Sequence, residues 1–181
     1  VMNGDWWAYR NRKKLSLDLV EPMRAASEHV IAVAPMMFVN AEVSFQNRKL
    51  ASVQTMGTSP DYAMTSSVEM GQGRFLTQAD VDNRSSVVVI GAEIGKVLFP
   101  GINPVGHRIL VDRRPYRIAG VIVERGTLLG QNVDLVVMLP YTAFQGHFGT
   151  QRDVTLVLAV DQQENVPRVQ DRLTETLRRE R

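Results

Sequence analysis

Hydrophobic and polar positions along this chain form short runs that predict strands separated by turns. The first run is residues 30–39, where apolar residues follow one another almost without interruption. It predicts a strand, and Pro35 places this strand at a sheet edge or beside a bulge, because proline has no backbone N–H to donate. Residues 41–45 and 50–56 then alternate around the polar turn at 46–49, which predicts a hairpin.

The stretch 86–107 has the sharpest pattern and organises the middle of the chain. Four β-branched apolar residues, 87–90, run into Gly91, which predicts a buried strand. A short helix is expected next, with three inward positions at the i, i+3, i+4 spacing of one helical face: Ile94, Val97 and Leu98. Pro100 and Gly101 end this helix, since proline lacks a donor and glycine tolerates a positive φ.

Helix-capping residues mark further elements. Ser16 is the expected N-cap of a helix that reaches about residue 27, and Asn165 is the expected N-cap of a final helix with Pro167 in its first turn. Thr77 and Asp80 have the spacing of a capping box. The remaining expected elements are a hairpin at 108–111 and 116–123, a mobile loop at 124–132, a strand at 133–139, a short helix after Pro140 and a strand at 154–160.

The order of these elements predicts an α+β protein with two subdomains. The chain opens with a helix followed by strands, and it closes with a strand followed by a helix. Turn residues gather at 57–62 and mark a boundary. We therefore expect residues 1–56 and 150–181 to form one α/β layer, with 57–149 inserted as a second, β-rich unit.

Composition and charge narrow the class of protein. The chain has 181 residues, of which 44% are hydrophobic and 22% charged, as in a globular protein with a real core. Its net charge of +2 is too small for a nucleic-acid platform, which needs basic residues massed on one face. Cysteine is absent, which excludes disulfides and thiolate chemistry but leaves the compartment open. No apolar run approaches the ~18 residues of a membrane span, and the start at Val1 suggests a piece of a longer or processed protein.

The N-terminal segment combines aromatic and basic side chains, and its candidate contact residues are Trp6, Trp7, Tyr9 and Arg10. Such residues can stack on a nucleic-acid strand, but no second basic face supports that interpretation. They can also cover the edge of a small core while the basic stems reach outward. Finally, they can form a partner surface, because Trp, Tyr and Arg are enriched at interface hot spots.

Motifs for catalysis and cofactor binding do not match. Residues 91–96 follow a strand as a phosphate-binding loop does, but the glycines are separated by three residues instead of four, and Val97 replaces the hydroxyl that binds Mg²⁺. Three histidines stand far apart and lack a second ligand at a metal-binding spacing: His29, His107 and His147. No Gly-x-Ser-x-Gly motif offers a nucleophilic serine. We therefore expect no cofactor, no metal and no enzyme activity in this chain.

Several sequence blocks, in a fixed order, carry a resemblance to a known family. They are 87–106 (Val-Val-Val-Ile-Gly-Ala-Glu-Ile-Gly-Lys-Val-Leu-Phe-Pro-Gly-Ile-Asn-Pro-Val-Gly), 117–122 (Arg-Ile-Ala-Gly-Val-Ile) and 134–141 (Asp-Leu-Val-Val-Met-Leu-Pro-Tyr), preceded by 57–62 and 73–80. Together they resemble the periplasmic core domain of MacB-type ABC transporter permeases over nearly the whole chain. The resemblance implies a porter-like α/β subdomain interrupted by an inserted β-rich Sabre-like subdomain, in agreement with the boundaries above.

This resemblance implies mechanical work and no catalysis. In the family, the segment is the extracytoplasmic loop between transmembrane helices 1 and 2, and a cytoplasmic domain hydrolyses ATP. The membrane helices relay that motion to the outer domains, which move macrolides, peptides, toxins or lipoproteins. The implied partners are a second permease copy or a paired permease, the cytoplasmic ATPase domain and, in many members, a periplasmic adaptor and an outer-membrane channel. The present chain lacks the membrane helices and the ATPase, and a further strand is expected after its last helix.

Two other functions remain open from the residues alone. A stand-alone extracytoplasmic module for a peptide or lipid predicts a deep, apolar-walled pocket within one monomer. A hydrolase predicts titratable side chains that converge in a cleft. For a partner surface, the candidates are the aromatic residues of the N-terminal segment and Leu128 and Leu129, in the loop that also holds Gly126, Thr127 and Gly130. The competing expectation is that they cover the core and form a flexible loop.

Overall fold

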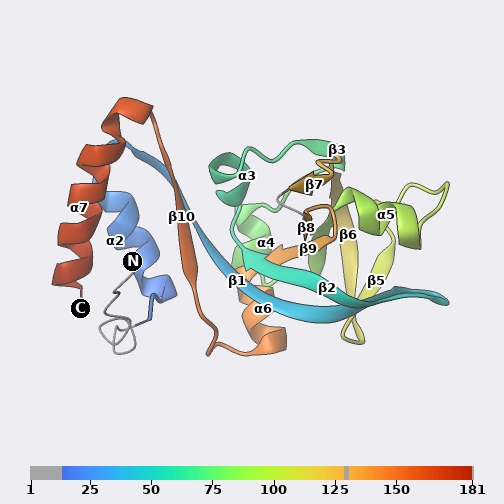
Figure 1. Cartoon of the computed structure of the whole chain (residues 1–181). Coiled ribbons are helices and arrows are strands. Elements are labelled where there is room, and N and C mark those ends of the chain that lie inside the picture. Colours follow the sequence, from blue (N-terminus) through green and yellow to red (C-terminus); the bar gives the residue numbers. More distant parts are fainter. Residues whose placement is uncertain (1–13, 129–130, 181) are drawn as a thin grey trace, which may run out of the picture.

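A mixed sheet of eight strands forms the body of the molecule in the computed structural model (Figure 1). The structure describes residues 14–128 and 131–180, and only the backbone of residues 127, 128, 131 and 132. The sheet contains β1 (Val30–Phe45), β2 (Arg48–Thr58), β3 (Met70–Gly73), β4 (Val87–Ile90), β5 (Arg108–Val111), β6 (Arg114–Ile122), β9 (Val136–Pro140) and β10 (Thr155–Val160). Its order is β10-β1-β2-β9-β4-β6-β3, and β5 pairs with β1 and β6. The pairs β2–β9 and β4–β6 are parallel.

Short helices and one hairpin surround this sheet. The helices are η1 (Leu17–Leu19), α2 (Val20–Ala25), α3 (Tyr62–Thr65), α4 (Gln78–Asp82), α5 (Ala92–Leu98), α6 (Tyr141–Phe148), η2 (Gln163–Asn165) and α7 (Val166–Arg179). A separate two-stranded hairpin consists of β7 (Thr127–Leu128) and β8 (Gln131–Asn132). None of the helices in the described ranges has both the length and the hydropathy that crossing a membrane requires.

Strand β1 is the longest element, and it changes neighbours along its length. Its first half pairs with β10 as far as Met36, and its second half pairs with β2 from Met37 onward. The register shifts of β1 lie near its two ends, between Val30 and Ala32 and between Ala41 and Val43. Pro35 therefore lies where β1 has a strand neighbour on one side only, which agrees with the expected edge position. Pro35 is buried inside the strand opposite Leu156, just before pairing with β2 begins.

Helices α2 and α7 pack against the first half of β1 and against β10. We call these four elements the helical layer (Figure 1). Its core is a hydrophobic cluster around Met23, Val33 and Val169. Val33 is completely buried. The partly buried residues packed on this cluster come from both helices and from β10: Leu19, Val20, Leu156, Leu158, Val160, Leu173 and Leu177. Burial of these side chains is what holds the two ends of the chain together, because helices of this length gain stability mainly from packing.

The rest of the sheet has one core on each face, and we call this part the body. One core contains Ile94 and Leu98 of α5 and Phe144 of α6, all fully buried. The other contains Met56, Val89 and Met138 and is partly covered by α3 and the segment at 75–76. The observed mixture of helices and one main sheet confirms the predicted α+β fold class. The subdomain limits 1–56 plus 150–181 and 57–149 stay a prediction.

Two of the expected helix caps differ from the sequence prediction. Ser16 and Asn165 make no capping hydrogen bond. Ser16 precedes the 3-10 turn η1 instead of an α-helix, whereas Asn165 ends η2 and occupies the predicted N-cap position of α7, with Pro167 in the first turn. The Asn165 side chain instead contacts Asp161 and His29. The capping box of Thr77 and Asp80 is confirmed, since both of its hydrogen bonds are present.

Other differences arise where local sequence signals are weak. Val97 was expected to point inward but is 38% exposed, because Ile94 and Leu98 already fill the face of α5 that meets the sheet. The segment expected as a mobile loop contains the β7–β8 hairpin. Helix α3 and strand β3 lie where the sequence indicated turns, and both are only four residues long.

Candidate functional site

The first candidate site is the seam between the helical layer and the body. Arg24, at the end of α2, donates a hydrogen bond to Asp61 at 2.7 Å, and Asp61 precedes α3. The same carboxylate oxygen lies 3.3 Å from the backbone N of Val33. The bond to Asp61 raises the pKa of the Arg24 guanidinium against the opposing effect of partial burial. One carboxylate therefore joins a helix, a strand and the turn before another helix.

A polar cavity of about 180 Å³ lies beside this ion pair. Its walls come from both sides of the seam, with Val20 and Glu21 from α2 and Gln78 and Tyr141 from the body. Ser59 also lines it, and its buried Oγ makes no hydrogen bond with any described residue. Because buried polar atoms are normally satisfied, the cavity suits water that bridges the two parts. The seam is thus polar and has room for water, which suits a joint better than a packed apolar core does.

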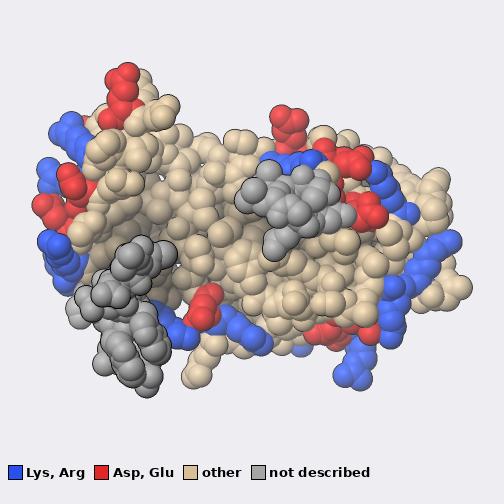
Figure 2. Space-filling model, viewed as in Figure 1, with Lys and Arg blue, Asp and Glu red and all other residues tan. Residues whose placement is uncertain are grey.

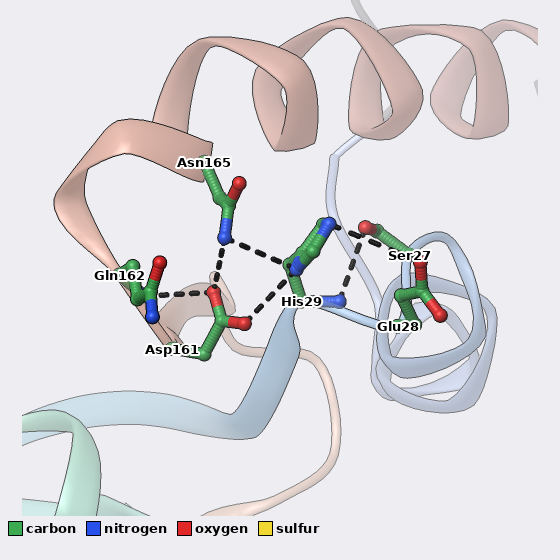
Figure 3. A network of polar contacts seen from close by, with 6 residues as sticks. All are labelled: Ser27, Glu28, His29, Asp161, Gln162 and Asn165. Atoms are coloured by element: carbon green, nitrogen blue, oxygen red, sulfur yellow. Dashed lines mark hydrogen bonds and ion pairs between the residues drawn. The ribbon is translucent and has the colours of Figure 1, made fainter.

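A second polar cluster holds the outer end of the helical layer together (Figure 3). The ring of His29 lies between α2 and β1, with Nδ1 2.9 Å from Asp161 Oδ2 and 3.1 Å from Asn165 Nδ2. Asn165 also donates to Asp161 at 2.8 Å. The hydrogen bond with His29, followed by that with Asn165, lowers the pKa of Asp161. The cluster of His29, Asp161 and Asn165 joins the turn between α2 and β1 to the turn between β10 and α7, and we call it the clasp.

The third candidate is an apolar groove of about 370 Å³ on the open face of the body. Its floor is a row of side chains from three adjacent strands, because Phe38 is opposite Met56 and Met56 is opposite Met138. Phe38 is 41% exposed, whereas Met56 and Met138 are buried. Methionine side chains adapt their shape to different contacts, as is common at surfaces that bind more than one partner.

Polar groups frame one end of this groove. Arg125 donates from Nη2 to the backbone oxygens of Ser66 and Ser67 at 2.9 and 2.7 Å and so bridges to the segment after α3. Asp134 accepts from the backbone N of Arg125 at 2.9 Å and of Gly126 at 2.6 Å. This buried carboxylate fixes the start of the segment that carries the β7–β8 hairpin.

Charged side chains avoid the middle of the face seen in Figure 2. They lie along α7, at the opposite end and along the upper and lower edges of this view, while the central area that grey atoms leave visible is almost free of Lys, Arg, Asp and Glu. The exposed residues Phe38, Asn40 and Gln54 on β1 and β2 are all uncharged. A neutral, partly apolar face of this kind is typical of an interaction surface.

The three histidines do not converge. His29 belongs to the clasp, and His107 is exposed beside Phe45 and Phe99. His147 lies half-buried on α6, with Nδ1 2.9 Å from the Tyr116 hydroxyl. Among the residues that the structure describes, no group of three His, Asp or Glu side chains is placed to hold a metal ion.

Most of the predicted contact residues cannot be placed. Trp6, Trp7, Tyr9, Arg10 and Leu129 lie outside the described residues, as does the side chain of Leu128. The seam residues Arg24 and Asp61 were missed because single charges at separate points of a sequence give no signal of their pairing. Asp134 begins the sequence block 134–141, but no local pattern predicts that it accepts hydrogen bonds from the backbone N–H groups of Arg125 and Gly126.

Comparison with known proteins agrees with the fold. The sequence model of the family described as MacB-like periplasmic core domain matches residues 1–176. The macrolide export ATP-binding/permease protein MacB of Bdellovibrio bacteriovorus is 27% identical over 167 residues, which are 92% of this chain and 26% of that protein. The chain thus spans about a quarter of the length of the curated relatives it matches.

Two solved structures confirm the mixed fold. The periplasmic region of MacB from Actinobacillus actinomycetemcomitans has a TM-score of 0.80 at 23% identity, covering 98% of this chain and 78% of that one. The extracellular domain of the noncanonic ABC-type transporter YknZ from Gram-positive bacteria has a TM-score of 0.79 at 14% identity, covering 97% and 89%. At these identities the similarity concerns the fold alone.

Proposed function

The chain belongs to the family of MacB-like periplasmic core domains of ABC transporter permeases, and we propose that it relays ATP-driven motion of membrane helices to export outside the inner membrane. The domain is tethered to that membrane on its outer side. ATP is hydrolysed by a cytoplasmic domain or subunit, and this domain itself is not an enzyme. Its contribution is to convert a displacement at its base into a displacement of the surface that meets cargo and partners.

The observation that carries this proposal is the continuity of β1. Its 16 residues run from the helical layer into the body, where they pair with β2 and β5. A hydrogen-bonded strand resists stretching, so a shift of its first half moves its second half as well. The first and last α-helices of the described residues, α2 and α7, lie side by side at the same end of the molecule (Figure 1). A displacement applied at either end therefore reaches the helical layer first.

The seam and the clasp have different parts in this relay. The clasp around His29 and Asp161 keeps α2, α7 and the first half of β1 moving as one unit. The polar seam with Arg24 and Asp61 lets that unit change its angle to the body within small limits. A single ion pair breaks and reforms at low cost, unlike a packed apolar core.

The partners follow from the transporter context. We propose that the domain works beside a second permease copy or a paired permease, coupled to the cytoplasmic ATPase domain. A periplasmic adaptor and an outer-membrane channel are further candidates, and nucleic acid is not a partner. The neutral face with its groove and the segment around Trp6, Trp7, Tyr9 and Arg10 are the proposed contact surfaces.

A two-residue insertion tests the relay. Gly-Gly placed between Met36 and Met37 of the full-length transporter loosens β1 where its neighbour changes from β10 to β2. Two residues preserve the alternation of inward and outward side chains. Export of a macrolide, the cargo named for the relative, should fall to background while ATP hydrolysis continues. The same insertion after Gln46, in the β1–β2 turn, is the control and should leave export unchanged. A folded variant that exports normally with the β1 insertion would contradict the proposal.

The groove favours a second candidate function, a stand-alone module that binds a peptide or lipid. Its apolar floor and volume fall in the range of small-molecule sites. Replacing Met138 by Gln and Phe38 by Ser should abolish binding of a fluorescent fatty acid to this chain if that function is right. In the transporter, the same variants should alter cargo preference and leave ATP hydrolysis intact. The two results separate the candidates.

A further inference from the structure

A hollow of about 430 Å³ lies at the far end of the body, between α5 and the outer strand β3. Its wall on the α5 side includes the small residues Ala92 and Gly95. Phe99 and Val121 also line it, and both are buried against the core of the body. The hollow shares one lining residue, Ile122, with the groove and none with the cavity at the seam.

Exposed apolar side chains gather around this hollow. Ile102 is 53% exposed and Val123 is 40% exposed, and both line it. Val97, on α5 one residue from the lining residue Lys96, is 38% exposed. Single exposed apolar residues are ordinary, but two that line one concave surface, with a third on the adjoining helix, indicate a contact that the monomer does not complete.

Strand β3 borders the hollow and is the end of the sheet. Among the described residues it pairs with β6 alone, so its other edge has backbone N–H and C=O groups without strand partners. Gly71 and Gln72 line the hollow, and glycine leaves this edge open to another backbone. The strand has only four residues and a register shift, which prevents open-ended aggregation and limits an added strand to a few hydrogen bonds. Most of the affinity must therefore come from the hollow.

The rim of the hollow is acidic. Glu124 lines it, Glu93 lies on α5, and Glu69 comes directly before β3 and accepts a bond from Val123 through its carbonyl. Lys96 is the one cation among the described residues that line the hollow, and its Nζ is 2.7 Å from Glu124 Oε1. Arg74, directly after β3, is paired with Asp80. Three carboxylates against one ammonium group favour a basic partner.

We propose that this edge binds an extended segment of a partner protein that adds to β3 as a further strand. One apolar side chain of the segment enters the hollow, and lysine or arginine residues beside it face the acidic rim. Strand addition of this kind takes its affinity from main-chain bonds and its specificity from pockets for alternate side chains. A second copy of the chain is a poorer occupant, because pairing β3 with itself brings the acidic rims together. The inference does not depend on the relay function.

A synthetic peptide of alternating valine and lysine, with both ends capped, is the probe. Titrated into the full chain, it should slow amide exchange at Gly71 and Gln72 and shift their NMR signals. Ile102→Gln and Val123→Gln should each weaken binding about tenfold, because an amide that the bound segment covers without a hydrogen-bond partner costs about that much. Leu110→Gln is the matched control, because Leu110 is 42% exposed on β5 and lies outside the hollow. It should bind like the wild type.

A second peptide tests the main-chain bonds. N-methylation of alternate residues removes backbone donors while it keeps the side chains, and this peptide should not bind. Equal binding by both peptides, or binding that survives Val123→Gln, would overturn the proposal. Dimerisation of the chain through β3 would also overturn it if the peptide does not displace the second copy, because the occupant of the edge would then be that copy. The proposal is likewise overturned if an excess of peptide leaves the NMR signals of Gly71 and Gln72 unchanged.

Discussion

Arg24 and Asp61 are 37 residues apart in the chain and form a 2.7 Å ion pair across the seam between the helical layer and the body. The same oxygen of Asp61 also lies 3.3 Å from the backbone N of Val33, in the part of β1 that pairs with β10. The helix, the long strand and the turn before α3 thus meet at one carboxylate. Any change in the angle between the two parts must alter this contact.

Replacing Arg24 by Gln should lower the free energy of unfolding by about 1 kcal/mol, because the two side chains are 39% and 31% exposed and solvent screens part of their attraction. Thermal unfolding should shift down by roughly 2–4 °C in a protein of this size. Lys49→Gln is the control, since its pair with Glu42 is more exposed at 60% and 37%. An equal decrease in the free energy of unfolding in both variants would show that the Arg24–Asp61 pair contributes no more stability than an exposed surface pair.

Asp80 should be the most costly single acidic residue to remove. Its side chain is 8% exposed and accepts bonds from Arg74 at 2.7 and 3.2 Å and from the backbone and hydroxyl of Thr77, both at 2.9 Å. Asp80→Ala should lower the free energy of unfolding by about 2 kcal/mol, since it removes a helix cap and leaves Arg74 unpaired. Urea unfolding at pH 7 measures this loss. A cost below that of Lys49→Gln would contradict it.

The Asp80 contribution should also depend on pH in one direction. Burial alone would raise the pKa of Asp80, but the bonds from Arg74 and Thr77 hold that pKa below its ordinary value. The unfolded chain then takes up the proton first. Stability from this group is present above about pH 4 and is lost as pH falls through the folded-state pKa. The difference between wild type and Asp80→Ala should therefore shrink below pH 4, in unfolding curves recorded at a series of pH values.

His147 should make stability fall in a higher pH range. Burial, together with the nearby charge of Arg114, lowers the pKa of His147 from its ordinary 6.5. Protonation then favours the unfolded chain, so stability is full above pH 6.5 and declines as pH falls toward the folded-state pKa. His147→Gln should remove this decline. A slope between pH 7 and pH 5 that is identical in both proteins would refute the assignment.

The Tyr116 hydroxyl is the partner of His147, and its removal isolates one hydrogen bond. Tyr116 is 2% exposed, so Tyr116→Phe leaves the ring in place and the Nδ1 atom of His147 without its partner. The free energy of unfolding should fall by about 1 kcal/mol. A loss near zero in denaturant unfolding would mean that water replaces the hydroxyl.

Elements with strong local signals could be predicted from the sequence. The run at 87–90 became the buried strand β4, and Thr77 and Asp80 form their capping box because all of its atoms lie within four residues. Contacts between residues far apart in the sequence could not be predicted in this way. His29 and Asp161 are 132 residues apart, and their pairing takes the Asn165 side chain away from the cap that the sequence predicts for it.

The candidate site shows the same limit. The floor of the groove joins Phe38, Met56 and Met138, which stand together only because β1, β2 and β9 pair in one register. Strand β9 follows β2 by more than 75 residues and lies parallel to it, an arrangement that the order of elements alone does not determine. Pattern predicts the strands, and only their pairing determines the site.

Gly91 illustrates how a residue that suggests one chemistry can have another physical reason. It follows β4 and opens α5, as a glycine of a phosphate loop would, but a Cβ atom there would lie 2.1 Å from the backbone oxygen of Asp134 and 2.6 Å from its carbonyl carbon. Real Cβ atoms do not approach backbone that closely, so Gly91→Ala must displace the segment of Asp134. We expect a loss of about 3 kcal/mol or more from this overpacking, measured by urea unfolding.

Gly95→Ala is the matched control, because Gly95 is the second glycine of the same motif. A Cβ atom there would have its nearest contacts at 3.5 Å from Pro104 and 3.7 Å from Val121, which is ordinary van der Waals distance. The site is inside α5, where alanine is favoured over glycine by about 0.5–1 kcal/mol, so this variant should be more stable than the wild type. A phosphate-loop role would make both glycines needed for the same ligand and would give their variants no reason to differ in stability. Opposite signs for the two variants in the same unfolding assay therefore identify close packing against Asp134 as the reason for Gly91, and equal signs would refute it.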